Sequence, residues 1–520
     1  MKSFMFPLLL IAIPALAAPP IGFDARVETL RQKTGVPGMA IAIVEGGKTV
    51  LARGYGTRRL GSPDKVDADT IFMTGSTGKA FTTAALATLA DAGRISWDDK
   101  VADRLPGFEM YDPWVTREMT IRDLLVHRSG LGLGEGDMLF VPRTNIPRAE
   151  AVRRLRYLKP ATSFRSGFAY DNVLYMVAGQ LIEAVTGQRW EDYVREHVLL
   201  AAGMTDSTTE NARRFADPDR AYPHARTSEA VRGAGPLGPL DERDALGDSA
   251  APAGGLAISA RDMAKWLTLQ LAHGELPGGG RLFSEAAHDE MWKPEILQPI
   301  DPLPDALKAT QPMFDTYAFG WEVRDYHGAK IVWHSGAVLG FQSVVVLLPE
   351  KNVGFAVEIN SEDGEILFGL MYELLDHYLG LPANDWPDKF AAYKRNRLAA
   401  AAAALTAASS KPAPVGPSLP LDRYVGTYVD PWYGRIRVTK GPAGLAVDFL
   451  STPRMRGPLG HWQYDSFVAR FTDKTIEPAY LTFALDADGH VAAITLKPVS
   501  PLADFSYDYQ DLLFKPIGGK

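Results

Sequence analysis

A change of sequence pattern near residue 400 constrains the fold of this 520-residue chain more than any other feature. Leu398 to Ala408 are nearly all alanine, which predicts a helix, and Ser409 to Pro420 are rich in Ser, Pro and Gly, which is typical of a linker. Before this point helical and strand patterns are mixed, and after it short apolar runs alternate. The chain is therefore expected to hold two domains of different class.

The part before the linker places strands at both ends and helices between them. We expect strands at 39–44, 49–53, 318–323, 330–333, 341–348 and 353–359, and helices at 22–33, 81–92, 173–186, 190–201 and 263–271. This order lacks the regular alternation of a βαβ fold and indicates α+β layers. We assign residues 18–385 to this domain and 386–420 to the alanine-rich helix and linker.

The part after the linker reads as β structure throughout. Short strands are expected at 436–438, 445–449, 467–471, 480–485 and 491–496, with turns at Gly441-Pro442 and Asp488-Gly489. Residues 421–520 are therefore predicted to form an all-β domain, a small barrel or sandwich. Side chains usually fill a barrel of this size, so its aromatic residues are expected to be core.

The first residues have the order of an export signal. Lys2 gives a positive start, Phe4 to Ala12 form an apolar run, and Ala15-Leu16-Ala17 fits a cleavage site. A buried N-terminal helix is the alternative. We predict a signal peptide over residues 1–17 and a periplasmic or secreted location, and the chain has no cysteine for disulfides.

The rest of the composition excludes several classes of partner. No later stretch has 18 or more apolar residues, so no membrane span is expected. The net charge of −7, without a clustered basic face, argues against nucleic acid. No HExxH motif and no close Cys/His/Asp cluster is present, so we expect neither a metal nor a cofactor.

Ser76-Thr77-Gly78-Lys79 has the spacing of a serine nucleophile and its lysine. At i and i+3 of a helix the two side chains lie on one face, and burial of the amine would lower its pKa and make it a candidate base. Ser62-Pro63-Asp64-Lys65 has the same spacing, but it lies among turn residues with no helix to align the pair. An N-cap serine is the alternative for Ser76.

Two further elements support the Ser76 assignment. Tyr170-Asp171-Asn172 is the only Y-x-N in the chain; a phenol can relay a proton, and a carboxamide can both donate and accept hydrogen bonds. A loop tyrosine and a helix-capping Asn172 are the alternative. His334-Ser335-Gly336 is the only H-x-G, at the end of an expected strand, where a glycine allows close approach of substrate.

With these three elements in this order, the chain resembles the serine β-lactamase and penicillin-binding-protein superfamily, and within it the class C β-lactamase-related peptidases and esterases. The resemblance spans about residues 23–380, and 421–520 resemble the lipocalin-like domain of some members. It implies a β-lactamase-like antiparallel sheet flanked by helices. It also implies that Ser76 forms the acyl-enzyme, that Lys79 and Tyr170 shuttle its proton, and that Asn172 binds the substrate amide.

The resemblance further implies that His334, Gly336 and Ala337 bind substrate, with the N–H groups of Ser76 and Ala337 forming an oxyanion hole. Many members carry Lys where this chain has His334, which near pH 7 is expected to be only partly charged. Strong β-lactam turnover is thus disfavoured. His127, in the stretch Leu124 to Leu131, is interpreted as structural.

The sequence leaves three functions open. The first is a peptidase or amidase that acts on a small or linear peptide, which can contain D- or unusual residues. Peptidases that degrade linearised cyclic peptides such as microcystin are enzymes of this kind. The second is a carboxylesterase or weak β-lactamase. The third is a non-catalytic binding or assembly protein on the same fold. Self-association into a homo-oligomer also stays open.

Overall fold

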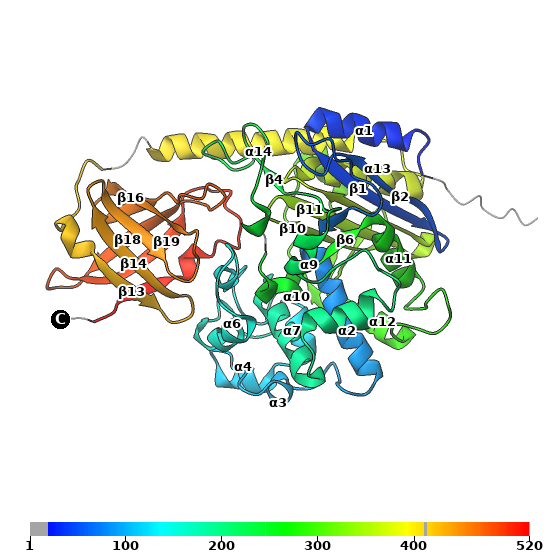
Figure 1. Ribbon diagram of the computed structural model, residues 1–520, viewed down its shortest axis with the longest axis horizontal. Coiled ribbons are helices and arrows are strands. Elements are labelled where there is room, and N and C mark those ends of the chain that lie inside the picture. Colours follow the sequence, from blue (N-terminus) through cyan, green and yellow to red (C-terminus); the bar gives the residue numbers. More distant parts are fainter. Residues whose placement is uncertain (1–18, 245, 410–412, 519–520) are drawn as a thin grey trace, which may run out of the picture.

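The protein is described by a computed structural model covering residues 19–244, 246–409 and 413–518 (Figure 1). A large helix-and-sheet domain and a smaller barrel stand side by side, and one long helix runs from the first toward the second. The predicted α+β fold with a C-terminal β-barrel is confirmed. The proposed signal peptide lies outside the described residues.

An antiparallel sheet of eight strands organises the large domain, in the order β2-β1-β12-β11-β10-β9-β8-β7. Its strands are β1 (Gly38–Glu45), β2 (Lys48–Gly56), β7 (Ile296–Leu297), β8 (Asp315–Tyr317), β9 (Glu322–Tyr326), β10 (Ala329–Val338), β11 (Phe341–Leu348) and β12 (Val353–Ile359). Two-stranded pairs join β3 (Ile71–Met73) to β6 (Ala257–Ser259) and β4 (His224–Ala225) to β5 (Gly238–Pro239).

Helices cover both faces of the sheet, which explains why its central strands are apolar throughout. Every residue of β1 and β12 is buried. Ile41 and Ile43 face the core under α1 and α13, whereas Ala42 and Val44 face the core under α2, α7 and α11. The helices are α1 (Phe23–Thr34), α2 (Lys79–Asp91), α3 (Val101–Arg104), α4 (Pro113–Glu118), α5 (Ile121–Leu125), α6 (Arg148–Arg154), α7 (Val173–Thr186), α8 (Trp190–Val194), α9 (Asn211–Ala216), α10 (Ala251–Gly254), α11 (Ala260–Leu271), α12 (Glu285–Met291), α13 (Gly364–Leu379) and α14 (Trp386–Ser409).

Two predicted elements differ from the structure. The strand expected at 318–323 is a turn followed by β9, because Gly320 has φ +75° and packs its backbone against that of Ala80. The helix expected at 190–201 is α-helical only to Val194 and continues as a π-helix over Arg195–Leu199. The N-terminus of α11 is capped by Ser259, whose side chain accepts a hydrogen bond from the Asp262 N–H.

The C-terminal domain is a closed antiparallel barrel. Its strands are β13 (Gly426–Asp430), β14 (Gly434–Gly441), β15 (Gly444–Phe449), β16 (Arg456–Gln463), β17 (Ser466–Ala469), β18 (Ala479–Leu485), β19 (Val491–Pro498) and β20 (Leu513–Pro516). Buried aromatic side chains, among them Tyr433, Phe449 and Phe514, contact one another edge to face, as expected for core.

The alanine-rich segment belongs to α14, which begins earlier than the alanine run and leads toward the barrel (Figure 1). The barrel also touches the large domain directly: Arg154 donates to the carbonyl of Tyr433 at 2.7 Å, and Asn145 N–H donates to that of Ser451 at 2.9 Å. Nowhere in the described ranges does a helix combine the length and apolar character needed to span a bilayer.

Candidate active site

Ser76 lies in a short 3₁₀ helix, Gly75–Gly78, which leads directly into α2. With three residues per turn, positions i and i+3 lie directly above one another. Lys79 Nζ accordingly lies 2.9 Å from Ser76 Oγ. Ser76 is partly exposed, whereas Lys79 is fully buried, so a solvent-accessible hydroxyl contacts a buried amine.

The Lys79 ammonium uses its three donors on three acceptors. Besides Ser76 it donates to Asn172 Oδ1 at 2.7 Å and to the carbonyl of Ala253 at 2.9 Å. Burial lowers the pKa of Lys79 to about 7, although the carboxylates of Asp137 and Asp171 act in the opposite direction. A substantial neutral fraction at pH 7 can therefore accept a proton from Ser76.

Asn172 directly precedes α7, but its side chain does not cap that helix. Its Oδ1 accepts from Lys79, and its Nδ2 donates to Asp137 Oδ2 at 2.8 Å. The capping alternative for Asn172 is therefore wrong. Asp137 lies in a Gly-rich turn that sequence patterns did not mark, because nothing in its spacing relates it to Asn172, 35 residues later.

Tyr170 lies over Lys79, with Nζ 4.8 Å from the centre of its ring. Burial of the hydroxyl raises the pKa of Tyr170 well above its usual value, and the nearby Ser76 hydroxyl offsets this only in part. Among the residues that the structure describes, the phenol oxygen has no hydrogen-bond partner. Tyr170 is thus protonated at neutral pH and poised to donate rather than to accept.

The ring of His127 packs against the ring of Tyr170. The two ring centres are 4.1 Å apart, and His127 Nδ1 accepts the backbone N–H of Asp171 at 3.1 Å. Burial lowers the pKa of His127, so the ring is neutral. These contacts agree with the structural interpretation of His127.

Gly336 and Ala337 lie on the part of β10 that faces Ser76. Strand β9 pairs with β10 only as far as Trp333, which leaves the next residues free to contact the 3₁₀ helix. A Cβ on Gly336 would lie 2.0 Å from the carbonyl oxygen of Thr74 and 2.9 Å from the N of Ser76, and one on Gly75 would lie 2.5 Å from the N of Ala337. These close contacts thus place the backbone N atoms of Ser76 and Ala337 at the junction between β10 and the 3₁₀ helix.

His334 is buried rather than open to the cleft. Its Nδ1 lies 2.6 Å from the carbonyl of Ser335 and therefore carries the proton, and its Nε2 accepts from the hydroxyl of Tyr317 at 2.9 Å. Burial lowers the pKa of His334 to about 3, and the charge of Lys79 adds to this. The expectation of a partly charged histidine is wrong, because burial keeps the ring neutral.

One grouping of metal-ligand types does arise in the described part of the chain: His273, His288 and Asp289. The fold brings His273, which follows α11, next to His288 and Asp289 within α12, which the sequence spacing did not suggest. The Asp289 carboxylate lies 3.4 Å from His288 Nδ1 and is exposed, so ordinary pairing accounts for the contact.

Gly336→Ala is expected to lower kcat on any acyl substrate by on the order of 100-fold or more, the cost of losing one oxyanion donor. The new methyl group would push β10 away from Thr74 and Ser76. Gly238→Ala, where nothing lies within 4 Å, is the matched control. Unchanged kcat for Gly336→Ala, with an unchanged melting temperature, would contradict this placement.

Comparisons with known proteins show the family to which the chain belongs. Residues 23–367 match the family model described as Beta-lactamase, and 410–516 match a domain of unknown function (DUF3471). An unguisins hydrolase from Aspergillus campestris is 31% identical over 426 residues, covering 78% of this chain and 74% of the relative. The chain therefore belongs to the Beta-lactamase family of serine hydrolases, which includes the penicillin-binding proteins.

Two solved structures share the fold over almost the whole chain. The octameric penicillin-binding protein homologue from Pyrococcus abyssi has a TM-score of 0.59 at 21% identity and covers 96% of this chain and 100% of its own. SurE with D-Leu has a TM-score of 0.51 at 20% identity and covers 96% of this chain and 99% of its own. At these identities the likeness concerns the fold.

Proposed function

We propose that this chain is an exported serine peptidase or amidase that cleaves small or linear peptides, including ones with D- or unusual residues, through an acyl-enzyme at Ser76. Linearised cyclic peptides are substrates of this kind. The observation that carries the proposal is the contact of 2.9 Å between the Ser76 hydroxyl and the buried Lys79 amine.

In the proposed acylation step, neutral Lys79 takes the proton of Ser76 as Oγ bonds to the substrate carbonyl carbon. The N–H groups of Ser76 and Ala337 stabilise the oxyanion. Tyr170 donates its proton to the leaving amine as the C–N bond breaks, and the Lys79 ammonium restores that proton. The raised pKa of Tyr170 and the lowered pKa of Lys79 support this division of roles.

In the proposed deacylation step, Lys79 alone transfers the proton. A water molecule attacks the acyl carbon and passes a proton to the now neutral Lys79. The ester bond to Ser76 breaks, and the serine oxygen regains a proton from the Lys79 ammonium. No group outside the described residues is needed for the proton balance.

The neutral state of His334 supports peptides and esters over β-lactams as substrates. A histidine with a pKa of about 3 supplies no cation for a substrate carboxylate at pH 7. The relative named as an unguisins hydrolase and the neighbour solved with D-Leu support peptides and D-residues. Export rests on Lys2, the apolar run and Ala15-Leu16-Ala17. Self-association is supported only by the octameric neighbour.

A substrate panel tests the proposal. Linear peptides with L- or D-residues, p-nitrophenyl esters and nitrocefin are compared by kcat/KM. We expect peptide cleavage, with nitrocefin slower on the order of 100-fold, because losing one hydrogen bond to a charged group costs about 1.5–3 kcal/mol.

Other outcomes separate the alternatives. A preference for short esters by several orders of magnitude would make the chain a carboxylesterase. Fast nitrocefin turnover would make it a β-lactamase and contradict the argument from His334. No turnover of any substrate, together with no covalent labelling of Ser76, would favour the binding or assembly role.

A further inference from the structure

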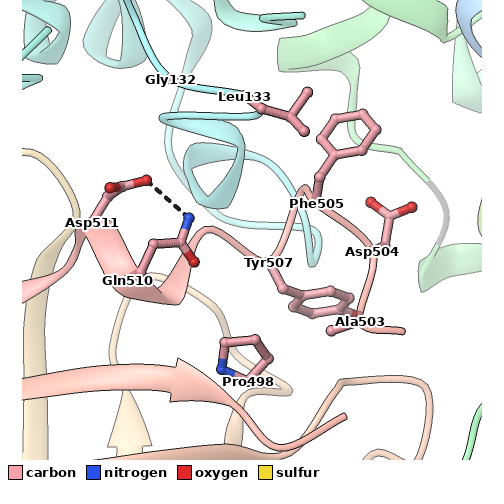
Figure 2. Close-up of a pocket in the computed structure, with 9 residues that line it drawn as sticks. All are labelled: Gly132, Leu133, Pro498, Ala503, Asp504, Phe505, Tyr507, Gln510 and Asp511. Carbon is pink, nitrogen blue, oxygen red and sulfur yellow. Dashed lines mark hydrogen bonds between the residues drawn. The ribbon is translucent and has the colours of Figure 1, made fainter. Parts of the chain in front are cut away.

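A segment of the barrel domain leaves the barrel and lies against the active site. It joins β19 to β20 and comprises residues 499–512, here called the β19–β20 segment. Its Phe505 ring lies 6.0 Å from the ring of Tyr170, and a Cβ on Gly134 would lie 2.6 Å from Phe505. Figure 2 shows Phe505 and Leu133 pointing toward one another where this segment meets the large domain, beside a cavity of about 340 Å³.

Asp508 of this segment holds the turn that carries Asp137. Its two carboxylate oxygens accept the backbone N–H groups of Gly136, at 2.6 Å, and Met138, at 3.1 Å. These N–H groups lie at the start of the 3₁₀ helix Asp137–Leu139, where a helix leaves donors unsatisfied. Asp508 is fully buried, so the barrel fixes the backbone of this turn from outside the large domain.

Ser506 of the same segment reaches the Asp137 side chain itself. Ser506 Oγ donates to Asp137 Oδ2 at 2.8 Å, and Asn172 Nδ2 donates to the same oxygen at 2.8 Å. A carboxylate only accepts, so Asn172 must turn its NH₂ group toward Asp137 and its carbonyl oxygen toward Lys79. Hydrogen bonds thus connect Ser506, Asp137, Asn172 and Lys79 to Ser76 without a break.

We propose that the barrel domain completes the active site: Ser506 and Asp137 are positioning residues that fix the Asn172 carboxamide and, through it, the Lys79 amine. Ser506 and Asp137 are 369 residues apart and both are buried at the contact. The barrel would then be required for proton transfer at Ser76 and not only for folding or assembly. This inference rests on the proposed role of Ser76 as the nucleophile.

The experiment measures how fast a fluorophosphonate labels Ser76 in the full-length protein, by intact mass, across pH. Ser506→Ala is expected to lower the labelling rate about tenfold at pH 7, the size of one hydrogen bond to a charged group. Ser506→Thr keeps the hydroxyl and should restore most of the rate. Ser500→Ala removes another serine of the segment, whose hydroxyl oxygen accepts the N–H of Leu502 in its own loop, and should label like the wild type.

The pH profile separates positioning from a general loss of structure. Burial raises the pKa of Asp137 to about 7, whereas the hydrogen bonds from Asn172 and Ser506 act in the opposite direction and favour its charged form. That charge raises the pKa of Lys79. Without Ser506, Asp137 is more often neutral, the pKa of Lys79 falls, and the rising limb of the labelling rate moves to lower pH. Damaged folding would lower the rate at every pH and leave the limb in place.

Each outcome decides between the claims. A Ser506→Ala variant that labels at the wild-type rate with an unmoved limb overturns the positioning role, as does a folded Ser506→Thr variant as slow as Ser506→Ala. If Ser506→Ala does not fold, Asp137→Asn, which keeps the volume, must show the same downward shift, and an unmoved limb overturns the proposal. Absence of labelling in the wild type would instead reject Ser76 as the nucleophile.

Discussion

Replacing Ser76 with alanine is expected to lower kcat/KM for peptide hydrolysis by on the order of 10⁴- to 10⁶-fold, the range seen when a serine nucleophile is removed. The substitution removes the oxygen atom that is proposed to form the acyl bond and leaves the neighbouring backbone unchanged. It should also abolish the covalent mass shift with a fluorophosphonate. Lys79 keeps its bonds to Asn172 and Ala253, so the melting temperature should change little.

The chain supplies its own matched control for this substitution. Ser62 has the same S-x-x-K spacing, but its hydroxyl donates to Asp64 at 2.7 Å in an exposed turn. Ser62→Ala should therefore keep the full rate and the full mass shift. If Ser76→Ala kept more than a few per cent of the peptide hydrolysis, another nucleophile would act and the proposed acyl-enzyme would be wrong.

Local patterns were sufficient to predict most of the regular elements. Strands β1, β11 and β12 and helices α1, α7 and α11 lie within a few residues of their predicted positions, because period and capping are properties of short segments. The prediction of a strand at 318–323 was wrong because the backbone of Gly320 packs against Ala80, which is distant in the sequence. The β pattern after the linker predicted an all-β domain. The barrel is closed by the pairing of β13 with β20, its first and last strands, which the pattern did not indicate.

The same distinction applies to the site. Ser76 and Lys79 could be paired from the sequence because they lie one turn apart. Tyr170 and Asn172 were found by a short motif, and the structure brings Asn172 onto Lys79. Burial and the charge of Lys79 keep His334 neutral, and Tyr317 donates a hydrogen bond to its ring. No local pattern connects Lys79 or Tyr317 to His334.

Asp137 and Ser506 illustrate what the sequence could not show. Their contact joins two domains and depends on how the barrel sits on the large domain, which hydrophobic periodicity does not encode. The domain boundary near residue 400 suggested an appended module. The hydrogen bond that Ser506 donates to Asp137 and the one that Asp508 accepts from Gly136 instead place part of that module within reach of the predicted nucleophile.

The second large effect is expected for Lys79→Gln, which removes the amine that faces Ser76 but keeps a side-chain donor for Asn172. Loss of a general base lowers kcat/KM by about 10²- to 10⁴-fold. The wild type should gain activity as pH rises through about 7, because Lys79 must lose its proton before it can accept one from Ser76. This rising limb should be absent from the residual activity of Lys79→Gln.

Lys65→Gln, at the exposed second S-x-x-K, is the control and should match the wild type in rate and pH profile. The measurement is kcat/KM on one peptide from pH 5 to 9, with melting temperatures for all variants. A Lys79→Gln enzyme that kept the rising limb would show that another group titrates there. Tyr170 could take that role only with a phenolate stabilised near pH 7, which conflicts with its buried hydroxyl and raised pKa. Asp137, whose pKa burial raises to about 7, is a neighbouring group that could titrate instead. The retained limb would therefore contradict Lys79 as the base and leave the protonated state of Tyr170 untouched.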